Sequence, residues 1–161
     1  MKDISPHLTV NWHSTVESES VALGPPNWLR QGDILVAGRG NRNYAVLIDN
    51  PPSHALASPH FFVISADANV VLPAFLAWQL NQEPAQRYLT GESEGTLTKS
   101  IRRKALDATP IAIPSIQKQR QIIALQAVAQ QKRQLYQRLI RNEDTLMAGI
   151  AAELLHDSTQ E

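Results

Sequence analysis

The sequence predicts an α+β fold, in which a compact mixed sheet-and-helix domain is followed by one long C-terminal α-helix that pairs as a coiled coil. Short apolar runs bounded by turn residues predict strands in the first part of the chain. A stretch with helical apolar spacing follows them, and the last third has no proline and a single glycine from Ser115 to about His156. We therefore expect the domain at residues 1–113, the helix at 114–157 and a disordered tail at 158–161.

Four strands are expected in the domain. Asp33–Ala37 and Tyr44–Ile48 are apolar runs on either side of the turn Gly38–Asn43, which predicts a pair of strands joined by that turn. His60–Ser65 predicts a third strand. Pro110–Ile113 predicts a short fourth strand that is bounded by prolines.

Two short helices are expected between the third and fourth strands. Leu72–Leu80 has its leucines and Phe75 at helical spacing, which predicts a helix with one buried face. A second short helix is expected at Pro84–Leu89. The stretch from Gly91 to Lys104 is expected to be a loop of Gly, Ser and Thr that becomes strongly basic.

The C-terminal helix is expected to begin after Ser115, whose hydroxyl is a good N-cap. Some 40 helical residues would be roughly 60 Å long, which is more than a domain of this size can cover. Nothing upstream is long enough to partner it, so we expect a helix from another chain; the alternative is a helix folded back onto its own domain. A wide apolar stripe favours pairing. Its first line, at heptad spacing, predicts the dimerisation residues Leu125, Val128, Leu135, Leu139 and Leu146.

Charge is distributed unevenly, although the formal net charge is zero. Residues 95–141 carry ten basic side chains and one acidic side chain, whereas residues 1–94 have a net charge of −4 and the last twenty residues −5. A basic segment on an otherwise acidic chain predicts a surface that faces a polyanion. For the helical part, Lys118–Arg141, an ordinary solvated helix face is the alternative.

The composition excludes several classes of function. The chain contains no cysteine, so it has no disulfide, thiolate metal site or thiol nucleophile. No apolar run approaches the ~20 residues that span a bilayer. The N-terminus lacks the apolar stretch of a secretory signal. We therefore expect a cytoplasmic protein without membrane association.

The Gly38-Arg39-Gly40 turn does not match a nucleotide-binding motif. A dinucleotide fingerprint needs G-x-G-x-x-G at the start of a helix, and a P-loop needs G-x-x-x-x-G-K-[ST]. Here a second strand follows, so no helix N-terminus points at a phosphate. The loop is expected to present Arg39, Asn41, Arg42 and Asn43 outward, where Arg can bind guanine or phosphate and Asn can bind adenine. An ordinary hairpin turn with solvated arginines is the alternative.

A second polar segment extends from Gly95 to Leu106. Its basic residues stand among Thr96, Thr98 and Ser100, a mixture that suits phosphate oxygens. A solubilising loop is the alternative. The candidate DNA-binding residues of the two segments are Arg39, Asn41, Arg42, Lys99, Arg102 and Arg103.

No catalytic or metal-binding arrangement is evident, so we expect a non-enzymatic protein without metal or cofactor. The five histidines are scattered, without the H-E-x-x-H spacing of a zinc site. No G-x-S-x-G elbow is present. "NPPS" at Asn50–Ser53 only resembles the N-P-P-[YF] tetrapeptide of methyl transfer, because it lacks the aromatic residue that would stack a flipped base.

Together these segments resemble, in order, the specificity (S) subunits of type I restriction–modification systems. "LRQGDILVAGRGN" resembles the family's Gly-Asp, strand and glycine segment, and "LPAFLAWQLNQEPAQRYL" its helix after the middle strand. "GESEGTLTKSIRRKAL" resembles the loop before the late strand. "LDATPIAIPSIQKQRQII" resembles the strand, proline and Gln-rich start of the spacer helix. The similarity is collinear over roughly residues 2–155, with "MKDISPH" similar to a segment within a target recognition domain.

The resemblance implies a non-catalytic role in DNA recognition. In this family a target recognition domain reads half of a split sequence in double-stranded DNA, and the long helices pair antiparallel to set the spacing between halves. The S subunit binds adenine methyltransferase (modification) subunits and, through them, the restriction subunit. The resemblance assigns residues 1–113 to the recognition domain and 114–157 to the spacer helix.

The chain has one domain and one helix, where full S subunits have two of each, so it resembles a half-subunit that homodimerises. Arg39 and Arg42 are then expected to read bases, whereas Lys99, Arg102 and Arg103 are expected to neutralise phosphates. Family domains usually begin with a further stretch before the "KDI" segment, with which this chain starts. The alternative is therefore a truncated S-like scaffold or modulator, which binds a methyltransferase subunit without reading DNA.

Overall fold

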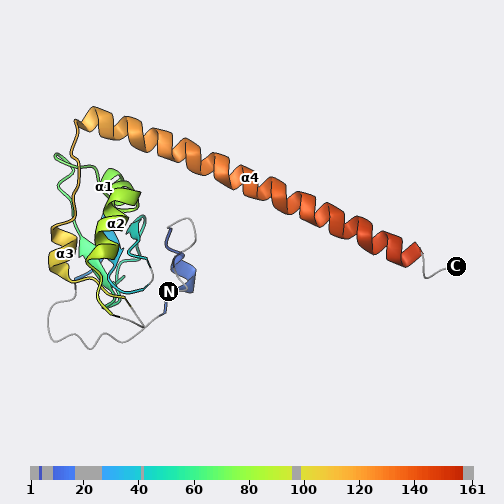
Figure 1. Cartoon of the computed structure of the whole chain (residues 1–161), viewed down its shortest axis with the longest axis horizontal. Coiled ribbons are helices and arrows are strands. Elements are labelled where there is room, and N and C mark those ends of the chain that lie inside the picture. Colours follow the sequence, from blue (N-terminus) through green and yellow to red (C-terminus); the bar gives the residue numbers. More distant parts are fainter. Residues whose placement is uncertain (1–3, 5–8, 17–26, 41, 96–98, 158–161) are drawn as a thin grey trace. The chain divides into compact units, whose positions relative to one another are not determined.

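The computed structural model describes residues 4, 9–16, 27–40, 42–95 and 99–157, and its fold is α+β, as predicted (Figure 1). The chain divides into two compact units between Arg120 and Gln121. The elements in chain order are η1 (Trp12–Ser14), β1 (Ile34–Ala37), β2 (Ala45–Leu47), β3 (Phe61–Ile64), α1 (Pro73–Leu80), α2 (Glu83–Gly91), α3 (Arg103–Asp107) and α4 (Ile116–Asp157).

The three strands form one antiparallel sheet in the order β2-β1-β3. Val36 of the central strand lies opposite Ala45 on one side and Phe62 on the other. The first three predicted strands and the turn between the first two are thereby confirmed; β1 begins one residue later than predicted, and β2 and β3 are each shorter by one residue at both ends. All four residues of β1 are buried, because both faces of the central strand are covered.

The alternation of side chains along β1 divides the interior into two clusters. Ile34 and Val36 pack with side chains of α1, α2 and α3 on one face of the sheet. Leu35 points to the opposite face, where it packs with Leu29, Ile48 and the partly buried Trp12. Helices therefore cover the face of the sheet that holds the larger cluster, and irregular chain covers the face that holds the smaller one.

The turn before β1 is held by a buried carboxylate. Asp33 accepts hydrogen bonds from the backbone N–H of Arg30 at 2.8 Å and from the Ser65 hydroxyl at 2.6 Å. Gly32 has a φ of 88°, a conformation that glycine adopts at little cost. The Gly-Asp pair thus links the start of β1 to the end of β3, and its role is structural.

The two predicted short helices are confirmed as α1 and α2, but two neighbouring predictions are wrong. Pro110–Ile113 is not a strand. Instead, the side-chain amide of Gln79 donates to the carbonyl of Ala112 and accepts from its N–H, as a neighbouring strand would. The predicted loop from Gly91 to Lys104 ends in the start of α3, because Ala105 and Leu106 are buried against the sheet.

The start of α4 is capped as predicted and is joined to the domain. The Ser115 hydroxyl accepts from the N–H of Lys118 at 3.4 Å. Gln119 is fully buried: its Oε1 accepts from the N–H of Leu72, and its Nε2 donates to the carbonyls of Val70 and Pro114. The first turn of α4 is therefore part of the first unit.

The rest of α4 continues to Asp157 as one uninterrupted helix, close to the predicted end. The predicted disordered tail at 158–161 lies outside the described residues. Within the described ranges, no helix has both the length and the apolar content needed to cross a membrane.

Candidate nucleic-acid interface

The turn after β1 and the segment before α3 lie side by side, although they are far apart in the sequence. The N–H of Gly40 donates to the carbonyl of Lys99 at 2.9 Å, and the N–H of Ile101 donates to the carbonyl of Gly38 at 3.0 Å. Arg39 and Ser100 thereby face each other in an antiparallel bridge. Backbones paired in this way are about 5 Å apart, so the structure brings together the two predicted DNA-binding segments.

Ser100 is also paired on its other side. Its N–H and carbonyl exchange hydrogen bonds of 2.9 Å with the carbonyl and N–H of Glu94. Residues that face each other in such bridges project to the same face. Arg39, Ser100 and Glu94 therefore share one face, and the next residue, Ile101, is buried in the larger cluster.

The two glycines allow this close arrangement for different reasons. A Cβ on Gly38 would lie 2.8 Å from a ring carbon of Phe62 and 3.2 Å from the carbonyl oxygen of His60. Gly40 has open space around it but a φ of 123°, which strains any other residue. The backbone therefore requires glycine on both sides of the exposed Arg39.

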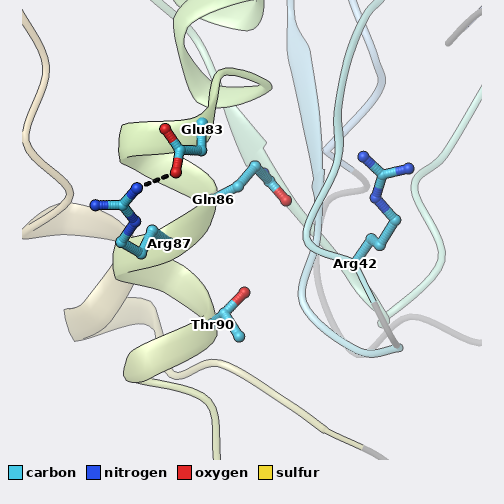
Figure 2. Close-up of a pocket in the computed structure, with 5 residues that line it drawn as sticks. All are labelled: Arg42, Glu83, Gln86, Arg87 and Thr90. Atoms are coloured by element: carbon cyan, nitrogen blue, oxygen red, sulfur yellow. Dashed lines mark hydrogen bonds and ion pairs between the residues drawn. The ribbon is translucent and has the colours of Figure 1, made fainter.

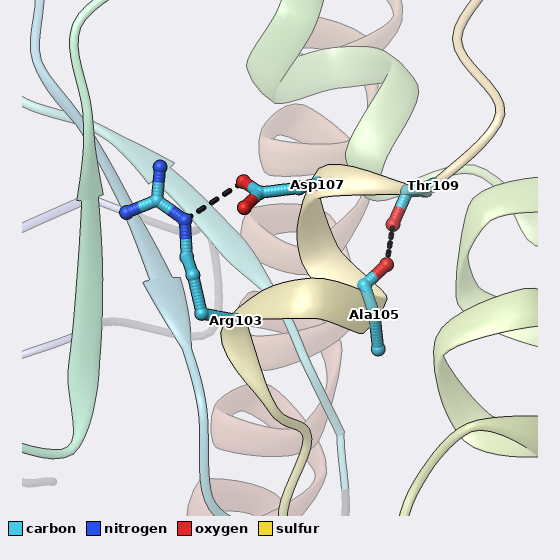
Figure 3. A network of polar contacts seen from close by, with 4 residues as sticks. All are labelled: Arg103, Ala105, Asp107 and Thr109. Atoms are coloured by element: carbon cyan, nitrogen blue, oxygen red, sulfur yellow. Dashed lines mark hydrogen bonds and ion pairs between the residues drawn. The ribbon is translucent and has the colours of Figure 1, made fainter.

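Arg39 and Lys99 are exposed, and neither forms an ion pair within the part of the chain that the structure describes. Arg102 and Arg103 differ in this respect. Arg102 contacts the Glu94 carboxylate at 2.7 Å, and Arg103 contacts Asp107 at 2.7 Å within α3 (Figure 3). These exposed pairs contribute little stability, but they compensate the charge of both arginines.

Asn43 does not face outward, so that prediction is wrong. It is buried, and its Nδ2 donates to the carbonyl of Ala37 at 2.9 Å, which closes the turn from within. Its own carbonyl accepts from Nε2 of Gln86 at 2.8 Å, which holds the loop against α2. Asn41, like Thr96 and Thr98, lies outside the described residues.

Arg42 is exposed and lines a pocket of about 320 Å³ between its loop and α2 (Figure 2). The other lining residues all come from α2: Glu83, Gln86, Arg87 and Thr90. Sequence reasoning missed these α2 residues as site candidates. The available signal was the polar face of the helix, on which Glu83 and Arg87 are spaced as an i, i+4 ion pair.

Tyr44 follows Asn43, and burial raises the pKa of its phenol above the ordinary value of 10.0. Its ring packs edge-to-face on Phe61, with centroids 6.3 Å apart. The phenol is therefore neutral at physiological pH. Among the described residues, no group of three or more His, Cys, Asp or Glu side chains could hold a metal ion.

The predicted dimerisation residues form an exposed apolar line on α4. Leu125 is 70% exposed, Leu135 57% and Leu146 63%, and Val128 and Leu139 are similarly exposed. The adjacent line, which includes Tyr136, Ile140 and Met147, is exposed as well. Lys132 lies 5.6 Å from the centroid of the Tyr136 ring, within cation–π range.

Comparison with protein-family models gives no match to this chain, and comparison with curated proteins gives none either.

Proposed function

We propose that the chain is a non-catalytic, cytoplasmic DNA sequence-recognition half-subunit of a type I restriction–modification system, which dimerises through α4 and docks modification subunits. The observation that carries the proposal is the pairing of the Gly38–Gly40 turn with Lys99–Ile101. Two basic segments that resemble family segments of the recognition domain are adjacent in space, and each offers a cation without an ion pair among the described residues.

The geometry of the turn supports contact with duplex DNA. The major groove of B-DNA admits a two-stranded β-ribbon, and an arginine at its tip can bind O6 and N7 of guanine. Arg39 lies between two glycines whose backbone groups are hydrogen-bonded to neighbouring segments. The backbone of Arg39 is therefore restricted to few conformations. Lys99, on the neighbouring segment, is suited to a phosphate because its ammonium acts as a point charge.

The exposed apolar stripe of α4 supports the dimer in this proposal, since large exposed apolar patches mark interaction surfaces. The charges along the helix favour an antiparallel pair of identical chains. Six basic residues lie between 118 and 141, and all four acidic residues lie between 143 and 157. Antiparallel pairing places the acidic end of each helix near the basic part of the other, whereas parallel pairing places like charges together.

A scaffold that binds a methyltransferase subunit without reading DNA is the second candidate function. Ion pairing of Arg102 with Glu94 and of Arg103 with Asp107 favours it, because two of the predicted phosphate-binding cations are already compensated. A scaffold needs no salt-dependent affinity for duplex DNA, so this property separates the two functions.

Affinity capture from the cells that encode the chain tests the proposal. The tagged protein is isolated, its partners are identified by mass spectrometry, and the bound DNA is sequenced. The matched control replaces both Arg39 and Lys99 by alanine; both residues are exposed, so the variant should fold and retain its protein partners.

The proposal predicts an adenine methyltransferase together with a recurrent split DNA sequence that the double variant no longer enriches. Capture of the methyltransferase by both proteins without enriched DNA would establish the scaffold instead. Absence of both the methyltransferase and enriched DNA would refute both functions.

A further inference from the structure

Two charged residues, Lys132 and Glu143, stand in the middle of the apolar stripe of α4. Residues three and four positions apart lie on the same face of a helix. For both charged residues, all four of these neighbours are apolar or aromatic. They are Val128, Ala129, Leu135 and Tyr136 around Lys132, and Leu139, Ile140, Leu146 and Met147 around Glu143. The stripe therefore carries one cation and one anion, each surrounded by apolar surface.

Neither charge is compensated by its own chain. Both side chains are exposed, and no ion pair in the described part of the chain includes either of them. The ammonium of Lys132 lies 5.6 Å from the centroid of the Tyr136 ring, a cation–π contact that supplies no negative charge. A helix that covers the stripe must therefore bring an opposite charge to each residue, because a buried, unpaired charge is costly.

A second copy of the chain supplies both opposite charges when the two helices run antiparallel. An antiparallel pair of identical helices has a two-fold axis, so every contact occurs twice. Placing Lys132 opposite the partner's Glu143 also places Glu143 opposite the partner's Lys132. Parallel helices in register would instead set each charge against the same charge, which is destabilising.

The register that pairs these charges also matches the apolar residues. Counted outward from Lys132 and the partner's Glu143, in opposite directions along the two helices, apolar side chains meet apolar side chains. The facing pairs are Leu125 with Ile150, Val128 with Leu146, Ala129 with Met147, Leu135 with Leu139, and Tyr136 with Ile140. A slip of about one helical turn, or four residues, would place Lys132 opposite Leu139 or Met147. Only one nearby register therefore satisfies both the charges and the apolar residues.

We propose that Lys132 of each chain binds Glu143 of the partner subunit, and that these two ion pairs select a second copy of this chain, antiparallel and in one register, to cover the stripe. The inference rests on the dimer of the proposed function and deepens it, because it names the residues that set orientation and register. Single polar residues among apolar seam positions specify register in coiled coils at a cost in stability.

Register also has a consequence for the dimer as a whole. A slip of four residues would move one helix along the other by about 6 Å, at about 1.5 Å per residue. The two ion pairs therefore fix the distance between the starts of the two helices, where each recognition domain is attached.

Charge reversal tests the inference, with sedimentation equilibrium of the full chain as the measurement. Lys132→Glu sets two carboxylates against each other at both pairs, and Glu143→Lys sets two ammonium groups against each other. Each substitution should raise the Kd of the dimer by about 100-fold or more. The double variant, Lys132→Glu with Glu143→Lys, exchanges the charges and should return the Kd to within about ten-fold of the wild type.

The matched control is Arg138→Glu, which makes the same reversal as Lys132→Glu on the side of α4 away from the stripe. It should change the Kd by less than about five-fold. In addition, an equimolar mixture of the two single variants should form a heterodimer about as tight as the wild-type dimer, because every facing pair then has opposite charges.

The possible failures are distinguishable. If the wild type is a dimer and neither single reversal weakens it, the inference is wrong and the proposed dimer stands in another register or orientation. If the double variant stays as weak as the single variants, the two charges do not face each other, and the inference is again overturned. A wild type that stays monomeric at high concentration would overturn both the inference and the dimer of the proposed function.

Discussion

Gly38 lies at the end of β1, where three segments meet. Its N–H donates to the carbonyl of His60, and its carbonyl accepts from Ile101. An added methyl group would collide with the Phe62 ring and would lie tightly against the carbonyl oxygen of His60. The residue therefore connects the sheet to the segment that carries Lys99.

Gly38→Ala is expected to destabilise the protein by about 1–3 kcal/mol, because the extra methyl group forces the Phe62 ring or the backbone to move. Urea unfolding measures the change in the free energy of unfolding. Gly91→Ala, at the end of α2 with nothing within 4 Å of its added Cβ, is the control and should be close to neutral. Equal stability of the two variants would show that the contact with Phe62 is relieved at no cost.

Arg39 and Lys99 are expected to contribute to DNA binding in different ways. Lys99→Ala should weaken binding to all sequences about equally and flatten the salt slope by roughly one unit. Arg39→Ala should relax the preference at one base position, at a cost of about 1–3 kcal/mol there. Binding isotherms on the enriched duplex and on its single-base variants measure both effects. Equal losses on all sequences for both variants would contradict this division of roles.

One side chain, that of Gln119, joins the segment before α1 to the start of α4 through hydrogen bonds. Gln119 binds the backbone at Leu72, Val70 and Pro114 from a fully buried position. Gln119→Leu has a similar volume but leaves these backbone groups without their partner. We expect a loss of about 3 kcal/mol or more, since each buried unsatisfied group costs about 1–3 kcal/mol.

The stability of Gln119→Leu is measured by chemical unfolding of the full chain. The exposed Gln117→Leu, in the same turn of α4, is the matched control and should stay within about 0.5 kcal/mol of the wild type. A small effect at position 119 would mean that water replaces the lost amide.

The apolar line of α4 is expected to be the dimer interface. Leu135→Lys combined with Leu139→Lys places two charges in its centre and should yield monomers, because a buried, unpaired ammonium is costly. Sedimentation equilibrium measures the mass. Gln130→Lys combined with Gln137→Lys adds the same charge at polar positions of the helix and should leave the dimer intact. A dimer that survives the leucine substitutions would place the interface elsewhere.

The orientation of the two chains in the proposed dimer is a prediction at the scale of the whole molecule. Because the chain has no cysteine, single cysteines report contacts directly. Antiparallel pairing centred between Leu135 and Leu139 places position 128 of one chain near position 146 of its partner. Under oxidation, a mixture of Val128→Cys and Leu146→Cys should form a mixed disulfide dimer, and neither variant alone should cross-link efficiently. Cross-linking of each variant with itself, and none in the mixture, would indicate a parallel pair.

Much of the fold could be predicted because its signals are local. The apolar runs around Gly38–Asn43 predict β1 and β2, and the proline-free stretch after Ser115 predicts α4. Pro110–Ile113 was misassigned because extended backbone needs a partner to become a strand, and here the partner is the side chain of Gln79. The helix α3 was missed because its five residues are too few to show a period.

The candidate site was less predictable than the fold, because its signals are not local. Asn43 is of a residue type that is common in exposed turns. It is buried here because its side-chain amide donates a hydrogen bond to the carbonyl of Ala37. The pocket-lining residues of α2 have no motif of their own, and they come together with Arg42 only because Gln86 holds the Arg42 loop against the helix. The sequence shows that Glu94 and Asp107 are present, but it does not show that they pair with Arg102 and Arg103.

By itself, the sequence determined the α+β class, the β1–β2 pair, the extent of α4 and the exposed polar character of the segments around Arg39 and Lys99, because these follow from periodicity, turn chemistry and capping along the chain. Only the tertiary structure decided that Gly38–Gly40 pairs with Lys99–Ile101, that the Arg42 loop lies against α2, and which arginines keep a free charge. These features depend on contacts between distant segments, which form where burial of Ile34, Val36 and Ile101 brings the backbones together.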